Sequence, residues 1–302
     1  MKKLIIAAGT GFLGNTLIKH FKNETKQIIV LTRGKNQAKD NIRYVHWDAK
    51  SITGWEHYLE GADVLINLTG KSVNCRYNDK NKAEILYSRI DSTKILAKAI
   101  QQCKHPPKHW INASTATIYR HSEDRQMDEA TGETGNDFSM TVANKWESAF
   151  FGTPAPSVIK TAIRTSIVLG KDGGALPIML KIAKCGLGGR QGNGQQFVSW
   201  VHQEDFARAV EFIINNKIAN AVNVTAPNPV HNYKFMKILR KKLGVPFGLS
   251  QPKWMLKIGA KIIGTETELI LKSRNVVPAR LSGQGFRFKF DTAEKALGNL
   301  LQ

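Results

Sequence analysis

The sequence contains few of the features that mark a disulfide-linked, metal-binding or membrane-spanning protein. Its 302 residues include three cysteines, Cys75, Cys103 and Cys185, and no two of them have the short spacing of metal ligands. No apolar run approaches the roughly 20 residues that span a bilayer. The apolar stretch Leu4–Ala8 resembles part of a signal peptide, but it is too short and glycines follow it. We therefore expect a buried first strand, no metal, no membrane span and a reducing, cytoplasmic location.

Acidic residues are scarce relative to basic ones. The chain has 24 Asp and Glu against 44 Lys and Arg, a net charge of +20, and residues 229–302 alone hold 14 Lys and Arg against 4 Asp and Glu. Such an excess can attract nucleic acid, a membrane surface or an anionic substrate, or can belong to solvated helix faces, the interpretation we favour. Nucleic acid is not expected, because no zinc-finger or basic-zipper pattern is present and aromatic residues do not alternate with the charges. Two lysine triplets each fall on one face of a predicted helix: Lys234, Lys237 and Lys241, and Lys253, Lys257 and Lys261.

The first half of the chain alternates short apolar runs with segments of helical periodicity. The longest predicted helix ends before Pro106-Pro107. Strands that are apolar on both faces and separated by helices imply a parallel sheet with helices on both sides. The predicted fold class is therefore α/β, a doubly wound parallel (Rossmann) sheet with a smaller, mostly helical C-terminal lobe. The six predicted strands of this half cover residues 4–8, 28–31, 42–47, 64–68, 110–113 and 157–164.

The turn after the first predicted strand fits the G-x-G-x-x-G pattern of dinucleotide-binding sites. It consists of Gly9, Thr10, Gly11, Phe12, Leu13 and Gly14. In a doubly wound sheet this turn directs backbone N–H groups at a pyrophosphate from the N-terminus of a helix, and glycines allow the close approach. Because the pattern follows a strand and opens a helix, we predict a dinucleotide site; the alternative is a tight strand–helix turn without a ligand.

The residues after the second predicted strand favour NADP(H) over NAD(H). An acidic residue there would bind the ribose 2′-hydroxyl of NAD, but this chain has Thr32 and Arg33 followed by Gly34-Lys35. The planar guanidinium of Arg33 can bind a 2′-phosphate, which a carboxylate would repel. The alternative is that Arg33 is simply an exposed loop arginine.

Further residues should border the same cofactor. Asp48 ends the third predicted strand and is a candidate contact for adenine, although it could equally stabilise a turn. Leu68, Thr69 and Gly70 end the fourth predicted strand, and Ser114 ends the fifth. Because ligands of doubly wound sheets bind beyond the carboxyl ends of the strands, we expect these four residues to lie beside the cofactor.

Several of these residues carry a resemblance to a known family. Ala8–Gly14, the Thr32-Arg33 pair and Asn67–Gly70 resemble an extended short-chain dehydrogenase/reductase. Longer motifs, spread over essentially the whole chain, resemble an atypical branch of this family that is usually labelled the epimerase family protein. Members of that branch end in a small carboxy-terminal domain of unknown function. In the wider superfamily a glycine would stand at position 8, where this chain has Ala8. The motifs are "RYNDKNKAEILYSRIDST" (76–93), "VLGKDGGAL" (168–176), "GGRQGNGQQFVSWVHQED" (188–205) and "VVPARLSGQGFRFKFDTAEKAL" (276–297).

The resemblance implies a catalytic Ser or Thr together with a Tyr and a Lys in a Y-x-x-x-K pair. A lysine ammonium one helical turn from the tyrosine lowers the pKa of the phenol, which can then exchange a proton with the reacting hydroxyl. Thr115, within "NASTATIYR", takes the Ser/Thr place. Alignment on Glu147 puts Ser139 and Ala143 in the places of the Tyr and the Lys, so the pair is missing. The literal Y-x-x-x-K at 233–237 lies in the basic C-terminal part, and we interpret it as a chance match.

Other side chains are candidates for the remaining roles. Tyr119 could supply a proton, the alternative being a packed tyrosine with a hydrogen-bonded hydroxyl. Arg164 and Arg190 are candidate partners of an anionic substrate. Trp200 and His202 belong to the segment that closes over substrate in such folds, although His202 could simply begin a helix.

These observations predict an NADP(H)-dependent oxidoreductase or epimerase. It would act on a hydroxyl or carbonyl of a small, polar, anionic and nucleotide-sugar-like molecule; the alternative is a non-catalytic NADP-binding regulator, which the missing Tyr/Lys pair favours. Residues 1–170 with about 203–228 would form the NADP-binding Rossmann domain, and 171–202 with 229–302 the substrate-side lobe. A homodimer is one assembly that this chain could form; the sequence does not determine the oligomeric state.

Overall fold

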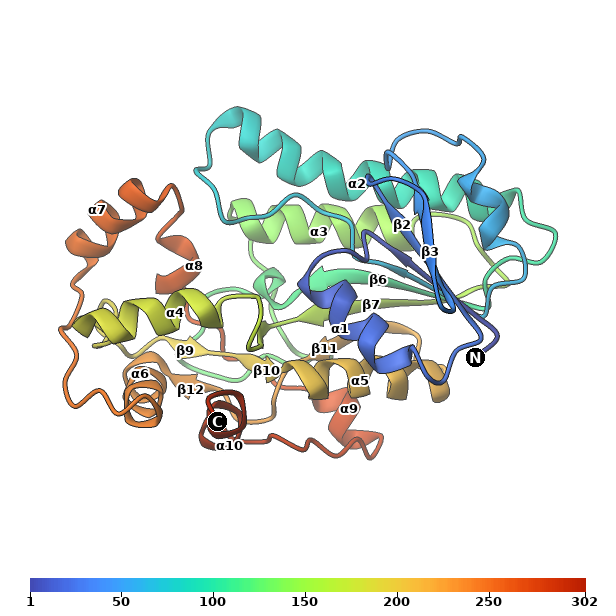
Figure 1. Cartoon of the computed structure of the whole chain (residues 1–302). Coiled ribbons are helices and arrows are strands. Elements are labelled where there is room, and N and C mark those ends of the chain that lie inside the picture. Colours follow the sequence, from blue (N-terminus) through green and yellow to red (C-terminus); the bar gives the residue numbers. More distant parts are fainter.

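A mostly parallel eight-stranded sheet forms the centre of the computed structural model (Figure 1). The structure describes the backbone of all 302 residues and every side chain except those of Ile262, Ile263 and Leu269. The strand order is β11-β7-β6-β5-β1-β2-β4-β3, and of these described strands only β3 runs antiparallel to its neighbour. The strands are β1 (Lys3–Ala7), β2 (Gln27–Thr32), β3 (Gln37–Lys39), β4 (Ile42–His46), β5 (Val64–Asn67), β6 (His109–Thr115), β7 (Ile159–Thr165) and β11 (Asn220–Val224).

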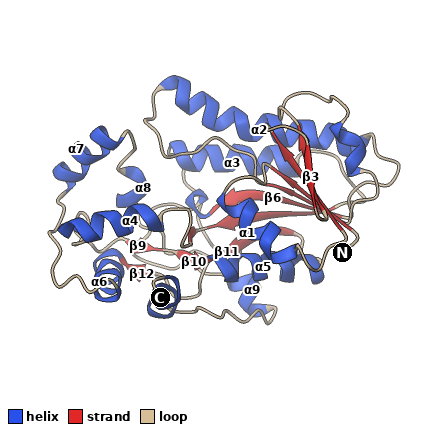
Figure 2. Cartoon of the chain, in the orientation of Figure 1, coloured by secondary structure: helices blue, strands red, loops and turns tan.

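Helices cover both faces of this sheet, as Figure 2 shows. Successive residues of β1 alternate between the two cores: Leu4 and Ile6 pack on the side of α5, while Ile5 and Ala7 pack on the side of α2. Strands that are buried on both faces and separated by helices are typical of a doubly wound sheet, so the predicted fold class is confirmed. The covering helices are α1 (Phe12–Phe21) and α5 (Gln203–Asn215) on one face, and α2 (Asp79–Gln101), α3 (Phe138–Phe151) and the short η1 (Trp55–Leu59) on the other.

Most of the remaining elements surround a third core, which contains Leu169, Trp200, Phe235 and Leu297. It joins two small sheets, β8-β10 and β9-β12, to mainly helical segments. Helix α9 (Ala279–Gly283) instead packs beside β11, through Leu281, in the core that contains Leu4 and Ile6. The other elements outside the large sheet are β8 (Ile167–Leu169), α4 (Leu176–Ile182), η3 (Ala183–Leu187), β9 (Phe197–Val198), β10 (Trp200–His202), β12 (Val230–His231), α6 (Asn232–Lys242), α7 (Lys253–Ile263), α8 (Glu268–Leu271) and α10 (Ala293–Leu300).

The two lysine triplets lie on exposed faces of α6 and α7. On α6 the opposite face buries Phe235, Met236 and Leu239 in the third core. This amphipathic arrangement fits solvated helix faces. None of the described helices is long and apolar enough to cross a membrane.

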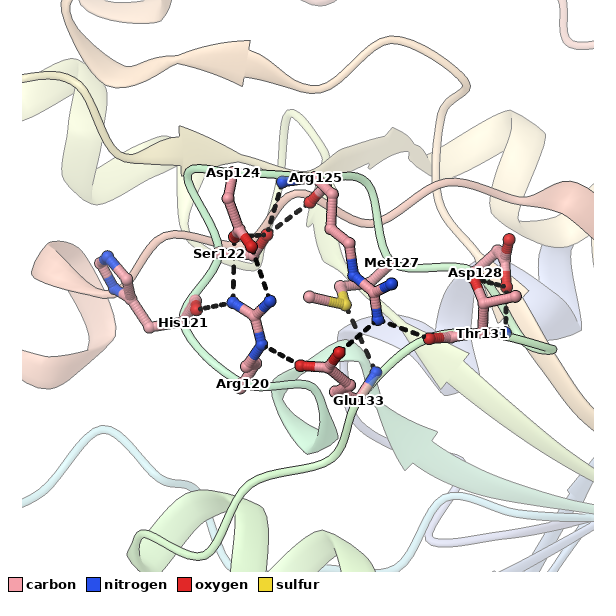
Figure 3. A network of polar contacts seen from close by, with 9 residues as sticks. All are labelled: Arg120, His121, Ser122, Asp124, Arg125, Met127, Asp128, Thr131 and Glu133. Carbon is pink, nitrogen blue, oxygen red and sulfur yellow. Dashed lines mark hydrogen bonds and ion pairs between the residues drawn. The ribbon is translucent and has the colours of Figure 1, made fainter.

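A network of ion pairs folds the loop after β6 and its short helix η2 (Ala116–Ile118) (Figure 3). Arg120 pairs with Asp124 at 2.7 Å and with Glu133, and Arg125 contacts Glu133 from the other side. The loop also binds a late segment of the chain: the Met127 N–H donates to the Asn275 carbonyl at 2.7 Å. The network therefore helps to hold residues 273–277 next to the sheet, although exposed ion pairs individually contribute little to stability.

Candidate functional site

The turn after β1 places an alanine where the backbone favours glycine. Ala8 has φ of 57°, in the left-handed region, and its N–H donates to the Leu31 carbonyl at 2.8 Å. A Cβ in this conformation lies too close to the backbone, which costs roughly 1–2 kcal/mol. The glycine expected at this position from the superfamily would avoid the strain, whereas Ala8 tolerates it because β2 fixes the turn.

The three glycines that follow have different surroundings. A Cβ added at Gly14 would lie 2.2 Å from the Gly9 carbonyl oxygen, so α1 and the turn after β1 can pack closely only because position 14 lacks a side chain. A Cβ at Gly9 would touch Ile6 and Val30 at 3.0 Å. A Cβ at Gly11 would meet no atom within 4 Å. Gly9 and Gly14 therefore serve packing, while Gly11 borders open space at the N-terminus of α1.

The N-terminus of α1 has the features of an anion site. Gly11 is its N-cap, no side chain caps the helix, and no acidic residue lies in its first turn. The first N–H groups of a helix have no partner within it and carry a partial positive charge, which favours a phosphate. The backbone of Thr10, Phe12 and Leu13 therefore fits a dinucleotide pyrophosphate at this position.

The Phe12 side chain has a separate role. A Cβ at Gly170 would lie 2.3 Å from the Phe12 ring, and one at Gly173 would lie 2.6 Å from it. The glycines after β8 thus make room for this ring. Phe12 links the first turn of α1 to the segment that leads into α4.

The loop after β2 presents Arg33 to solvent. Thr32 is buried, and its hydroxyl accepts a hydrogen bond from the Gly34 N–H at 3.1 Å, which bends the chain. Arg33 and Lys35 are exposed, and within the described part of the chain neither forms an ion pair. A free guanidinium in this loop is suited to a 2′-phosphate.

Asp48 caps the turn that follows β4. Its carboxylate accepts hydrogen bonds from the Lys50 and Ser51 N–H groups at 2.8 and 2.9 Å and from the Ser51 hydroxyl at 2.6 Å. These bonds, that from the Ser51 hydroxyl foremost, lower the pKa of Asp48 to about 2. The turn-stabilising role is thus present, and contact with adenine stays a prediction.

The residues after β5 lie beside the end of β1. The Leu68 N–H donates to the Ala7 carbonyl at 3.0 Å, and the Thr69 N–H donates to the Asn67 side chain at 3.0 Å. The Thr69 hydroxyl is buried and has no hydrogen-bond partner within the described part of the chain. Buried polar groups are normally paired, so this orphaned hydroxyl fits a polar ligand atom beside Leu68–Gly70.

Two hydroxyl-bearing residues, Ser114 and Thr115, lie at the end of β6, and they differ in burial and in hydrogen bonding. Ser114 is buried and donates to a Glu147 carboxylate oxygen at 2.5 Å. Thr115 is partly exposed, and its hydroxyl contacts only the Thr117 N–H and hydroxyl, at 3.2 and 3.0 Å. Thr115 is therefore the one of the two that could contact a reacting oxygen.

Tyr119 and Arg164 belong to an internal network, which corrects two expectations. Tyr119 is 0% exposed; its hydroxyl donates to Asn223 at 2.9 Å and accepts from Arg164 at 2.8 Å. Burial raises the pKa of Tyr119, although the Arg164 charge acts in the opposite direction. The guanidinium of Arg164 also contacts Glu147 through two bonds of 2.9 and 2.7 Å. Because these groups satisfy one another, the packed-tyrosine alternative is favoured, and Arg164 has no free charge for a substrate.

The three remaining candidates, Trp200, Arg190 and His202, differ in how exposed they are and in what they contact. Trp200 is 0% exposed and packs within the third core, which does not favour contact with a substrate; its role in substrate binding stays an untested prediction. Arg190 is exposed on a loop that the Gln251 N–H holds by donating to its carbonyl at 2.9 Å. His202 caps α5 by accepting from the Glu204 N–H at 3.0 Å, which confirms the helix-start alternative.

Other side chains fill the places of the missing Tyr/Lys pair. Ser139, in the first turn of α3, hydrogen-bonds to Asp137 at 3.1 Å and to Glu268 of α8. Lys272 pairs with Glu268 at 2.9 Å and with Asp137. Burial favours the neutral acid at Asp137, but the bonds from the Lys272 ammonium, the Met140 N–H and the Ser139 hydroxyl, together with the charge of Lys272, offset this effect and lower the pKa of Asp137. Sequence reasoning missed Glu268 and Lys272, because nothing local indicates that α8 lies against α3.

Ala143, in the place of the lysine, is 0% exposed in a small apolar cluster. The 233–237 motif lies on α6, beside the third core, and its Tyr233 is exposed. This position outside the large sheet is what a chance match predicts. Among the side chains that the structure describes, no group of three His, Cys, Asp or Glu residues is placed to hold a metal ion. The other members of the cluster around Ala143 are Ala116, Ile118, Tyr119, Met127 and Val276.

The strand order, the glycine turn and the uncapped helix N-terminus are together typical of the Rossmann-type fold of nucleotide-binding proteins. Residues 4–142 match the NAD dependent epimerase/dehydratase family, and residues 251–300 match a domain of unknown function, DUF1731. The chain is 33% identical over 300 residues to the epimerase family protein YfhF of Bacillus subtilis, covering 99% of this chain and 97% of that protein. It therefore belongs to the NAD dependent epimerase/dehydratase family, in the branch of YfhF-like epimerase family proteins that carry DUF1731.

Two solved structures resemble the whole chain. One is the human epimerase family protein SDR39U1 (isoform 2) with NADPH, which is 27% identical with a TM-score of 0.86 and 99% coverage of both chains. The other is the nucleoside-diphosphate sugar epimerase from Corynebacterium glutamicum, 26% identical with a TM-score of 0.78; the match covers 99% of this chain and 58% of that one.

Proposed function

We propose that the protein binds NADP(H) across the carboxyl ends of β1, β2 and β5. The observation that carries the proposal is the uncapped N-terminus of α1, with open space at Gly11 where a side chain would otherwise stand. Two further residues support the proposal: Thr69, after β5, has an unpartnered buried hydroxyl, and Arg33, after β2, has an exposed side chain. Both strands are neighbours of β1 in the sheet. The human relative, whose crystal structure contains NADPH, favours the phosphorylated form of the cofactor.

The reaction we infer is oxidoreduction or epimerisation at a hydroxyl or carbonyl of a small anionic, nucleotide-sugar-like substrate. When bound, the nicotinamide supplies the hydride chemistry. Thr115 would hold the reacting oxygen by a hydrogen bond from its partly exposed hydroxyl. Tyr119 is left out as proton donor because its hydroxyl already has two protein partners. The name of the Corynebacterium protein supports a nucleoside-diphosphate sugar as the substrate class.

Two measurements test this function. NADPH and NADH are titrated separately by nucleotide fluorescence, and tighter binding of NADPH is expected. The protein is then incubated with NADPH, a carbonyl panel and nucleotide sugars. Turnover that falls on the order of 10²-fold in Thr115→Ala would support the enzyme, whereas equal or absent affinity for both nucleotides would refute the cofactor assignment.

A non-catalytic NADP-binding regulator is the second candidate function. The observation that favours it is the occupation of the Tyr and Lys places by Ser139 and Ala143, neither of which can exchange a proton as that pair does. A ligand that binds one conformation better than another shifts the balance between them. NADPH binding without turnover on the whole panel would support the regulator.

A further inference from the structure

Arg89 places a charge on the buried side of α2. Ile85, Thr93 and Leu96 lie four residues before, four after and seven after it, and all three are buried. Helical neighbours at this spacing share one face, so the sequence would predict an apolar residue at position 89. Its guanidinium carbon instead lies 5.1 Å from the ring centre of Trp146 on α3. An arginine in such a position needs a partner for its donors and its charge.

Only one nitrogen of the Arg89 guanidinium has protein partners among the described residues. Nη1 donates to the carbonyls of Lys71 and Ile85 at 3.1 and 2.8 Å. The other edge lies against Gly70: a Cβ there would be 3.1 Å from Nη2 and 3.2 Å from Nε. Arg89 keeps part of its surface exposed. Two donors are thus available next to Gly70, at the end of β5.

The charge of Arg89 also lacks a counter-ion. Among the described residues no carboxylate lies within 4 Å of it; Glu84 and Glu266 pair with Lys71 and Arg76 instead. Burial lowers the pKa of Arg89 to about 10, so the guanidinium stays protonated at neutral pH. A desolvated charge without a partner is costly, and an anion that supplies the partner gains that free energy on binding.

Tyr77 adds a second unpartnered donor to the same region. Its hydroxyl is buried and has no hydrogen-bond partner among the residues that the structure describes, and its ring packs edge-on against Phe138 with 4.9 Å between the ring centres. Burial and the charge of Glu268 raise the pKa of Tyr77, while the charge of Arg89 acts to lower it. The phenol therefore remains a hydrogen-bond donor, and it lies next to the first turn of α3 where the catalytic tyrosine is missing.

We propose that Arg89 and Tyr77 form an anion-binding subsite at the carboxyl edge of the sheet, which takes a phosphate group of the cofactor or of a nucleoside-diphosphate substrate. The subsite rests on the proposed function, because it assumes that such ligands bind beyond β1 and β5. The two free donors of Arg89, Nε and Nη2, lie on one edge of the guanidinium and match the geometry of two phosphate oxygens, and the Tyr77 hydroxyl can donate to a third. The lack of a side chain at Gly70 keeps this edge accessible.

The test uses Arg89→Met, Arg89→Lys, Tyr77→Phe and Gly70→Ala in the full chain, with NADPH, UDP and inorganic pyrophosphate titrated separately by calorimetry. Arg89→Met should lose about tenfold or more in affinity for the ligand whose phosphate occupies the subsite. Gly70→Ala should lose a similar factor, because its Cβ would lie 2.9 Å from the guanidinium carbon and displace it. Arg89→Lys and Tyr77→Phe should show smaller losses. Arg287→Met, which removes an exposed arginine, is the control and should change nothing.

The pattern of losses identifies the ligand. A loss for NADPH alone assigns the subsite to the cofactor, and a loss for UDP alone assigns it to the substrate. Unchanged affinities in variants that melt like the wild type would overturn the subsite and leave the cofactor proposal standing. If the wild type binds UDP through Arg89 but not NADPH, the cofactor proposal fails and the subsite stands. Absence of binding to all three ligands would refute both.

Discussion

Single residues decide which nucleotide this fold can accept and how much strain its turn carries. Arg33 is the exposed cation after β2, and Ala8 is a left-handed residue with a side chain. Neither residue is part of a core, so each can be changed with little effect on packing. Substitutions at the two positions therefore separate the electrostatic contribution to binding from the backbone contribution to stability.

Arg33→Ala should weaken NADPH binding by roughly 10- to 100-fold, because a hydrogen-bonded charge contributes about 1.5–3 kcal/mol. NADH, which lacks the 2′-phosphate, should bind equally well to the variant and the wild type. Fluorescence titration of both nucleotides measures the ratio. Arg43→Ala, at an exposed arginine of β4, is the control for loss of one positive charge. A retained NADPH preference in the Arg33 variant would contradict the assignment.

Ala8→Gly should raise the free energy of unfolding by about 0.5–1 kcal/mol. Relief of the left-handed strain, roughly 1–2 kcal/mol, exceeds the gain in unfolded-chain entropy of about 0.4–1 kcal/mol. Urea unfolding followed by circular dichroism gives the difference. The matched variant Ala7→Gly, in the extended strand β1, should be destabilised by about the same amount. Destabilisation of both variants would mean that Ala8 carries no strain.

At the scale of elements, the sheet and the glycine turn could be predicted from the sequence because their signals are local. Strands buried on both faces leave apolar runs, and the G-x-G-x-x-G pattern joins one strand to one helix. The networks at the site could not be predicted in this way. Tyr119 is hydrogen-bonded to Asn223, 104 residues later in the sequence, and Ser139 to Glu268, 129 residues later. These partners depend on how β11 and α8 pack against the rest of the chain. The one local signal overlooked was Arg89, a charge at the buried spacing of α2.

Two glycine variants should separate the roles of the turn before α1. Gly14→Ala forces a Cβ to 2.2 Å from the Gly9 carbonyl oxygen, so we expect a loss of about 1–3 kcal/mol in stability along with weaker nucleotide binding. Gly11→Ala meets no neighbouring atom; its stability should fall by at most about 1 kcal/mol, while its NADPH affinity falls at least tenfold. Thermal unfolding and NADPH titration of both variants test this, and normal binding by Gly11→Ala would argue against a phosphate at α1.

At the scale of the whole molecule, two buried histidines tie stability to pH. His109 is 3% exposed and contacts the Thr161 hydroxyl at 2.7 Å, and burial lowers its pKa to about 4. Burial also lowers the pKa of His202. Its Nδ1 must be unprotonated, because it accepts the hydrogen bond from the Glu204 N–H that caps α5. Both groups resist protonation in the folded chain more than in the unfolded chain.

Stability should therefore fall as the pH drops below about 6.5, where unfolded histidine begins to bind protons, and should continue to fall to about pH 4. Between pH 7 and pH 5, His109 alone should remove about 2 kcal/mol from the free energy of unfolding. Urea titrations at the two pH values measure the loss. His109→Gln, which keeps a donor for Thr161 but does not titrate, should show a smaller difference; an equal difference would exclude His109 as its source.

The apolar cluster around Ala143 limits how the site could be redesigned. Ala143 is fully buried against Met127 and Val276, and the latter belongs to the C-terminal region. A lysine restored at this position would bring an ammonium into contact with hydrocarbon, where an unpaired charge is strongly disfavoured. Substituting Tyr at 139 and Lys at 143 would therefore not be enough to install a working catalytic pair in this fold. The packing of residues 127 and 276 over α3 would have to change as well.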